Sequence, residues 1–217
     1  MDLIKFVTQI AGKKATVALP WYRAGGIPAA NCIGAYKAIG SPSLAASYVN
    51  LANPGTYDLT TAAEPTFDQS YGWYFNGSTM YLGTGIVPVN NQTWSMAIRY
   101  TDASGLLAGI DSPGANDFYL AYNVYYSSVN LLIKSPTKAS GILMMCGVNA
   151  YRETTLEGTI TAGSASNTCP IWIGAAGAAT PLSFGVSKIQ AIAIWNTDIS
   201  AYQAQVHAAM AALAANP

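Results

Sequence analysis

The sequence is poor in charge. Lysine, arginine, aspartate and glutamate make up only 9% of its 217 residues, and the ten basic and ten acidic residues give a formal net charge of zero. A typical soluble domain carries about a quarter of such residues. Because binding a phosphate backbone needs a basic patch and only Lys13-Lys14 places two bases together, we expect no nucleic-acid partner. An uncharged surface instead favours contact with copies of itself or with another protein.

Cysteine, histidine and long apolar runs are also scarce. Cys32, Cys146 and Cys169 are too few and too scattered for a disulfide scaffold or a zinc site. Cys146 and Cys169 are expected to be buried and reduced, with a pairing across a sheet as the alternative. The single histidine, His207, argues against a catalytic triad or a multi-histidine metal site, and we interpret it as a helix-surface residue. No apolar run reaches the roughly 18 residues of a membrane span. The acidic start, with Asp2, lacks the basic region of a signal peptide.

What the chain does contain is a regular series of short apolar runs typical of β-strands, from Thr66 to Asn196. In the stretch 93–100 every second residue from Trp94 to Tyr100 is large and apolar, which predicts a half-buried strand. Clusters of Gly, Asn, Ser and Pro separate such runs, as in an antiparallel sandwich. The expected strands are 32–38, 66–68, 73–75, 80–82, 93–101, 105–110, 116–122, 129–134, 141–148, 154–160, 170–174 and 186–196.

Local patterns predict the connections and the two ends of the chain. The Asn76-Gly77 turn predicts a tight hairpin between 73–75 and 80–82, and the segment 43–51 is read as a short strand or a helical turn. Ser200 as N-cap, followed by apolar residues at helical spacing, predicts a C-terminal helix over 200–215 that lies on the edge or back of the sandwich.

The N-terminal segment has one apolar helical face, made by Leu3, Phe6, Val7 and Ile10. We therefore expect residues 1–28 to be an arm that docks on a neighbouring chain, with a disordered terminus as the alternative. The remaining residues, 29–217, are predicted to form a single domain.

Several motifs, in order, resemble one known family. They are Phe-Asn-Gly-Ser-x-x-Tyr-Leu at 75–82, Trp-Ser-Met-Ala-Ile-Arg-Tyr at 94–100, the segments 149–152 and 158–160, Pro-Ile-Trp-Ile-Gly at 170–174 and the closing segment 185–200. Together they are similar to the concanavalin A-like lectin/glucanase jelly rolls of the laminin-G-like type. The segment 48–55 is similar to the lead-in of laminin-G-like proteins in phage and metagenomic sequence. The resemblance implies an all-β antiparallel jelly-roll sandwich with a short C-terminal helix and an N-terminal arm.

The resemblance also raises two kinds of chemistry. Glycoside hydrolases of this superfamily use paired carboxylates, but Glu153 and Glu157 would lie on one strand face about 13 Å apart, too far for either glycosidase geometry. We therefore expect no enzyme activity. Laminin-G-like domains often bind calcium through rim carboxylates, so calcium is the one cofactor left open. Its candidate ligands are Asp102, Asp111, Asn116 and Asp117, with ordinary turn formation as the alternative.

Aromatic side chains are the leading candidates for binding, because their rings combine an apolar body with a polar edge. The candidate ligand-binding residues are Tyr119, Tyr122, Tyr125, Tyr126, Tyr151 and Trp172, with core filling as the alternative. The resemblance and the low charge imply a non-enzymatic structural or surface protein of a virion, a capsid decoration or tail-associated protein that forms a homo-oligomer or joins other structural proteins and contacts glycan or host. The alternative is a secreted or cell-surface carbohydrate-binding module, and the third is a glycan-active hydrolase.

Overall fold

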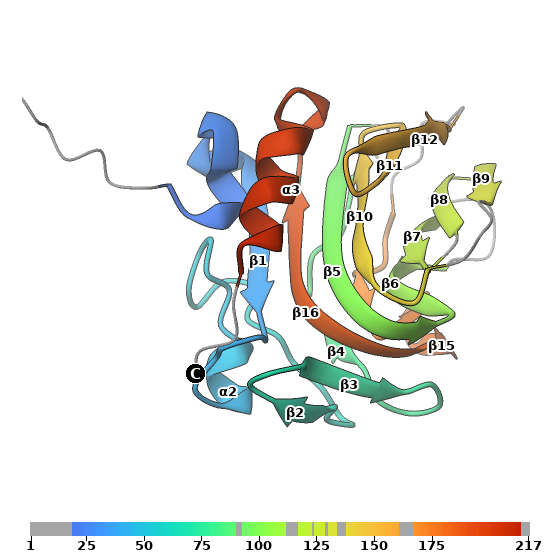
Figure 1. The fold of residues 1–217 in the computed structure, drawn as a ribbon. Helices are drawn as coiled ribbons and strands as arrows, with labels where there is room; N and C mark the ends of the chain where they lie inside the picture. Colours follow the sequence, from blue (N-terminus) through green and yellow to red (C-terminus); the bar gives the residue numbers. More distant parts are fainter. Residues whose placement is uncertain are drawn as a thin grey trace, which may run out of the picture.

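The computed structural model describes residues 19–89, 93–111, 117–122, 124–128, 130–133, 138–160 and 167–213. Two antiparallel sheets face each other, and Figure 1 shows the larger one curving around the smaller. The larger sheet contains β1 (Cys32–Lys37), β2 (Thr66–Asp68), β3 (Gly72–Asn76), β5 (Ser95–Ser104), β10 (Gly141–Cys146), β11 (Asn149–Arg152), β12 (Thr155–Thr159) and β16 (Val186–Trp195). The smaller sheet contains β4 (Leu82–Gly83), β6 (Leu106–Ile110), β7 (Asp117–Ala121), β8 (Val124–Ser128), β9 (Asn130–Ile133) and β13 (Trp172–Ile173). The predicted all-β antiparallel sandwich is confirmed.

The strand order places distant segments side by side. The larger sheet runs β12-β11-β10-β5-β16-β3-β2, with β1 also paired to β16, and the smaller sheet runs β4-β13-β6-β7-β8-β9. A separate ribbon pairs β14 (Ala175–Gly177) with β15 (Pro181–Phe184). These two strands were not predicted, because β14 contains only Ala and Gly, and β15 is a four-residue strand that begins at a proline.

The main core fills the space between the sheets. Ile98 and Tyr100 of β5 and Trp73 of β3 are fully buried there, and Phe118 and Leu120 of β7 meet them from the smaller sheet. Each such side chain contributes roughly 1.5–3 kcal/mol by leaving water. The alternation predicted for 93–100 is therefore confirmed, and it leaves the intervening residues of β5 on the outer face of the larger sheet. The prediction of a half-buried strand is wrong, because Ser95 and Ala97 on that outer face are also buried.

A C-terminal helix covers part of that outer face (Figure 1). The chain forms a 3-10 turn, η3 (Ser200–Tyr202), and then α3 (Gln203–Ala211), whose Val206 and Met210 pack in a second buried cluster with Ala97 and Ala193. The predicted helix is confirmed, but the prediction of Ser200 as its N-cap is wrong. The carboxylate of Asp198 accepts the Ser200 backbone N–H at 2.8 Å, and α3 itself begins after Tyr202 without a side-chain cap.

The predicted hairpin around Asn76-Gly77 is also wrong. Strand β3 pairs with β2 and β16 in the larger sheet, whereas β4 pairs with β13 in the smaller one. The turn is real, because the Asn76 side-chain oxygen accepts the backbone N–H groups of Ser78, Thr79 and Met80 at 3.0, 3.0 and 3.3 Å, and Gly77 has φ +74°. It carries the chain from one sheet to the other.

The remaining local predictions have mixed outcomes. The segment 43–51 contains a helical turn, α2 (Leu44–Ser47), whose Ala46 N–H is capped by the Ser43 hydroxyl at 3.1 Å. Cys146 and Cys169 are both free, as is Cys32, so no disulfide pairing forms between them.

Packing against the sandwich begins before residue 29. The 3-10 segments η1 (Trp21–Gly26) and η2 (Ala29–Asn31) lead into β1, Ile27 is fully buried, and the Trp195 indole N–H donates to the Tyr22 carbonyl at 3.0 Å. Leu3, Phe6, Val7 and Ile10 lie outside the described residues, so the docking arm stays a prediction. Among the described residues, no helix has the length and apolar character needed to cross a membrane.

Candidate functional site

A row of aromatic and glycine residues crosses the outer face of the smaller sheet. Strand register pairs Gly83 with Trp172, Trp172 with Gly109, Gly109 with Tyr119 and Tyr119 with Tyr126. Directly paired residues of neighbouring strands share a face. We call Gly83, Trp172, Gly109, Tyr119 and Tyr126 the aromatic row.

The aromatic row faces away from the core. Phe118 and Leu120, the neighbours of Tyr119 along β7, are fully buried between the sheets, whereas Tyr119 and Trp172 are half-buried. Because side chains alternate between the two faces of a strand, the row must lie on the opposite, outer face. The side chains of Tyr119 and Trp172 are therefore partly exposed on this face.

Gly109 lies between the two aromatic residues in the strand register, and it is buried. Its φ of +150° disfavours other residues, and an added Cβ would lie 2.1 Å from Cβ of Tyr119, a distance that real atoms do not adopt. Trp172 and Tyr119 are two strands apart, about 10 Å. The close approach of β6 and β7 at Gly109 thus fixes the spacing of these two aromatic residues.

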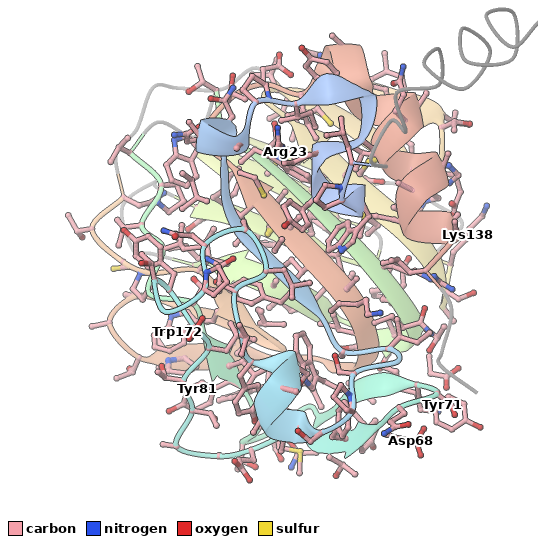
Figure 2. All side chains as sticks on the ribbon, turned by 90° about the vertical axis from the view of Figure 1, so that its left-hand side faces the viewer. Arg23, Asp68, Tyr71, Tyr81, Lys138 and Trp172 are labelled. Atoms are coloured by element: carbon pink, nitrogen blue, oxygen red, sulfur yellow. The ribbon has the colours of Figure 1, made fainter. Side chains whose placement is uncertain are left out.

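The Trp172 ring is held in place by its neighbours. Tyr81 contacts the Trp172 ring edge-on, with ring centroids 5.4 Å apart and ring planes at 87°. The Trp172 indole N–H donates to the Ala178 carbonyl at 3.3 Å. Figure 2 shows Tyr81 and Trp172 near each other at one edge of the molecule. Such an edge-to-face pair contributes about 0.5–1.5 kcal/mol beyond its buried area. A fixed ring loses little entropy when it binds a ligand.

The other predicted aromatic residues lie elsewhere. Tyr125 is fully buried, which raises the pKa of its phenol, and its hydroxyl donates to the Tyr151 carbonyl at 3.0 Å. Tyr151 packs in the cluster beneath α3, and Tyr122 packs against the main core. The structure therefore brings three of the six predicted residues, Tyr119, Tyr126 and Trp172, into one row and separates the rest.

A buried ion pair between the sheets was not anticipated. Nε of Arg152 lies 3.1 Å from Oε1 of Glu157, and the two side chains are only 6% and 16% exposed. The guanidinium also donates to the Tyr100 hydroxyl at 3.3 Å and to the Tyr122 carbonyl at 3.1 Å. Burial raises the pKa of Tyr100, and Arg152 partly opposes that rise. These contacts link β11 to β12 and β5, and they occupy Oε1 of Glu157, whereas its Oε2 is buried without a hydrogen-bond partner among the described residues.

Glu153 lies on the other side of the larger sheet from Glu157, so the prediction of one shared strand face is wrong. Glu153 has φ +55° in the turn between β11 and β12. One of its oxygens accepts the Ile142 N–H at 3.1 Å, and the other lies 2.7 Å from Nε2 of His207. His207 is therefore a partner of the sheet rather than only a helix-surface residue.

The candidate calcium ligands do not converge among the described residues. Asp102 lies 2.6 Å from the Lys188 ammonium, and Asp111 accepts the Ser183 hydroxyl at 3.2 Å. Asp117 is half-buried on β7, and Asn116 lies outside the described residues. In the part of the chain that the structure describes, no group of three or more His, Cys, Asp or Glu residues is placed to hold a metal ion. Calcium binding stays a prediction.

Neither a known protein family nor a curated protein matches the sequence. Among solved structures, the chain is similar to a Trypanosoma rangeli sialidase in complex with 2,3-difluorosialic acid, with a TM-score of 0.54 and 14% identity over 99% of this chain and 39% of the sialidase chain. A second structure of the Trypanosoma rangeli sialidase has a TM-score of 0.53 and 16% identity, over 99% of this chain and 39% of the sialidase chain. Domain 4 of an extracellular arabinanase from Geobacillus stearothermophilus, in complex with arabinotriose, has a TM-score of 0.39 and 13% identity, over 82% of this chain and 98% of the arabinanase domain.

These likenesses concern the fold, and the chain spans about two fifths of the sialidase chains it matches. They overturn the prediction of a virion structural protein, because the similar structures with a TM-score above 0.5 are sialidases and none of those named is a capsid or tail protein. What the chain shares with them is a β-rich fold that occurs in proteins acting on glycans.

Proposed function

We propose that this chain is a non-catalytic carbohydrate-binding module with a concanavalin A-like sandwich, and that the aromatic row is its binding face. The observation that carries the proposal is the placement of the half-buried Trp172 and Tyr119 on one outer face, with Gly109 between them in the strand register. A sugar ring has an apolar face and a polar rim. Aromatic rings pack against the apolar face of the sugar, and the polar groups of Tyr and Trp can hydrogen-bond to its hydroxyl groups.

Binding rather than hydrolysis agrees with the state of the carboxylates. Hydrolysis of a glycosidic bond needs two carboxyl groups facing one substrate, about 5 to 9.5 Å apart. Glu157 is paired with Arg152 between the sheets, and Glu153 is held by Ile142 and His207 on the outer face of the larger sheet. The chain's similarity to a sialidase described with a bound sialic acid derivative supports glycan as the ligand class.

A glycan array followed by calorimetry tests this function. We expect the unaltered chain to bind a subset of immobilised glycans, and Trp172→Ala to weaken that binding about tenfold to a hundredfold by removing the larger ring. Tyr74→Ala is the matched control, since Tyr74 is 39% exposed on the larger sheet and away from the row. Equal binding by all three proteins, at unchanged melting temperature, would refute the proposed face.

A product assay separates the enzymatic alternative. The glycan that binds most tightly is incubated with the unaltered chain, and reducing ends are measured over time. We expect no release of sugar above buffer. Steady release that is lost in Glu153→Gln or Glu157→Gln would replace the binding module with a hydrolase.

A further inference from the structure

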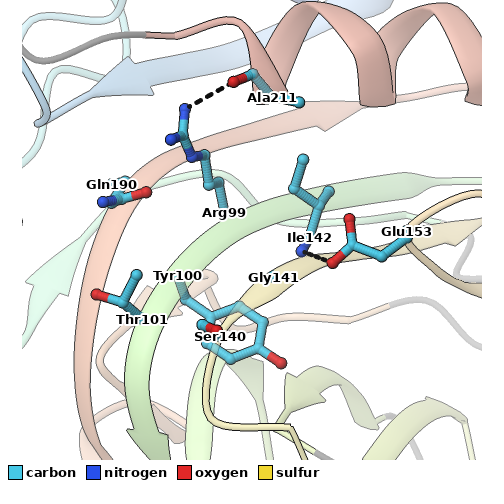
Figure 3. A pocket seen from close by; sticks show the side chains of 9 residues that line it. All are labelled: Arg99, Tyr100, Thr101, Ser140, Gly141, Ile142, Glu153, Gln190 and Ala211. Atoms are coloured by element: carbon cyan, nitrogen blue, oxygen red, sulfur yellow. Dashed lines mark hydrogen bonds between the residues drawn. The ribbon is translucent and has the colours of Figure 1, made fainter.

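A second pocket lies on the opposite side of the sandwich. It occupies about 300 Å³ on the outer face of the larger sheet, beside the C-terminal end of α3, and its lining includes Arg99, Thr101, Glu153 and Gln190 (Figure 3). Ligand sites in proteins range from about 300 to 1,000 Å³. The size of this pocket therefore suits a small ligand or one terminal unit of a longer ligand.

The side-chain amide of Gln190 has no hydrogen-bond partner among the described residues. The residue as a whole is only 7% exposed, but its amide atoms are not themselves buried, because they face the pocket. Register shows why it lies there: Ile189 pairs with Tyr100 and Ala191 with Arg99, so Gln190 is the extra residue of a β-bulge. Bulges redirect side chains and are common beside binding sites. Its backbone carbonyl, by contrast, accepts two N–H groups, from Ala38 and Ile39.

Arg99 and Glu153 lie on two sides of the pocket and are fixed in place. One guanidinium nitrogen of Arg99 donates to the Met210 and Ala211 carbonyls at 2.9 and 3.5 Å, and also to the Leu213 carbonyl. Glu153 is held by its two hydrogen-bond partners in a left-handed backbone conformation. Strained conformations of this kind gather at functional sites.

Gly141 completes the wall on the Glu153 side. A Cβ at this position would lie 2.3 Å from Oε1 of Glu153. The absence of a side chain lets the carboxylate reach the Ile142 N–H and face the pocket, as Figure 3 shows. The polar groups are thus positioned before any ligand arrives, which lowers the entropic cost of binding.

The charges around the pocket balance. Among the lining residues, Arg99 contributes one positive charge and Glu153 one negative charge, and His207 contacts Glu153 from outside the lining. The Gln190 amide and the Thr101 hydroxyl can each donate and accept. A site with mixed donors and acceptors and no net charge suits a neutral, hydroxyl-rich molecule better than an anion or a cation.

We propose that this pocket is a second binding site, which takes one neutral sugar unit through its hydroxyl groups, with the Gln190 amide as a direct partner. The choice of sugar as the ligand class rests on the proposed function, but the site does not involve the aromatic row. The two sites lie on the outer faces of different sheets, so each can be tested without the other.

Nuclear magnetic resonance of the full chain provides the test, with the neutral methyl glycosides of glucose, galactose and mannose as probes. We expect at least one of them to shift the backbone amide signals of Thr101, Ile142 and Gln190 in a saturable way. Gln190→Leu, which keeps the side-chain volume, should weaken this binding about fivefold to tenfold by removing the amide. Gln205→Leu is the matched control, because Gln205 is exposed on α3 outside the pocket.

The outcomes separate the two proposals. Saturable shifts around Gln190 that weaken in Gln190→Leu and persist in Gln205→Leu and Trp172→Ala support the second site. No shift there with any glycoside, or shifts of equal affinity in Gln190→Leu, overturns it. If glycan binding depends on Trp172 and no signal near Gln190 shifts, the aromatic row is supported as a binding face and the proposal of a second site in the pocket is rejected.

Discussion

Arg152 and Glu157 are charged groups taken almost completely out of water, and each depends on the other. Removing one partner of a buried pair leaves an uncompensated charge, which costs far more than the pair itself contributes. We expect Arg152→Met to lower the free energy of unfolding by about 3–5 kcal/mol. Urea denaturation measures this free energy of unfolding. Lys188→Met is the control, because its pair with Asp102 is exposed and should leave the transition unmoved. Similar midpoints for both variants would contradict this account.

The three free cysteines differ in burial, and their reactivity should differ accordingly. Burial raises the pKa of Cys32 to about 12 and also raises that of Cys146. A raised pKa keeps the thiol protonated at pH 8, and only the thiolate reacts. Cys169 is half-buried. We expect iodoacetamide to add once, at Cys169, to the native protein and three times after denaturation, as read by intact mass. Rapid native labelling of Cys32 would contradict this expectation.

The turn at Asn76 is held by its own side chain, although the strands on either side of it do not pair with each other. Asn76→Ala removes an acceptor for three backbone N–H groups, and we expect it to destabilise the protein by about 1–2 kcal/mol. Thermal unfolding monitored by circular dichroism measures the change. Asn53→Ala is the control, since Asn53 is exposed and its side chain makes no hydrogen bond to the described residues. Equal melting temperatures for the two variants would show that the turn is not held by this side chain.

Local pattern predicted the elements better than their partners. The alternation in β5 and the helical spacing before Met210 depend on neighbouring residues, and both predictions are confirmed. The choice of β16 rather than β4 as the partner of β3 depends on contacts more than 100 positions apart, which a turn motif cannot report. The same limit applies to the sites. Trp172 and Tyr119 could be proposed as aromatic residues, but their alignment through Gly109 follows from cross-strand register.

The whole molecule carries its two proposed sites on opposite outer faces, with the core and the buried ion pair between them. If both bind sugar, a single chain joins two glycan strands, and avidity exceeds either affinity. We expect a branched neutral polysaccharide recognised by both sites to form larger particles with the unaltered chain, as measured by light scattering. Trp172→Ala and Gln190→Leu should each keep binding but lose this effect. Undiminished particle growth in both variants would point to self-association of the chain instead.

The aromatic row has one further consequence. Its members come from β4, β13, β6, β7 and β8, so it depends on the pairing of strands and not on the segments that join them. Connections between these strands can therefore lengthen, shorten or exchange sequence while the spacing of the rings is kept. A single change at Gly109, in contrast, would press a side chain against the backbone of Tyr119 and disturb the pairing of β6 with β7 without altering any loop.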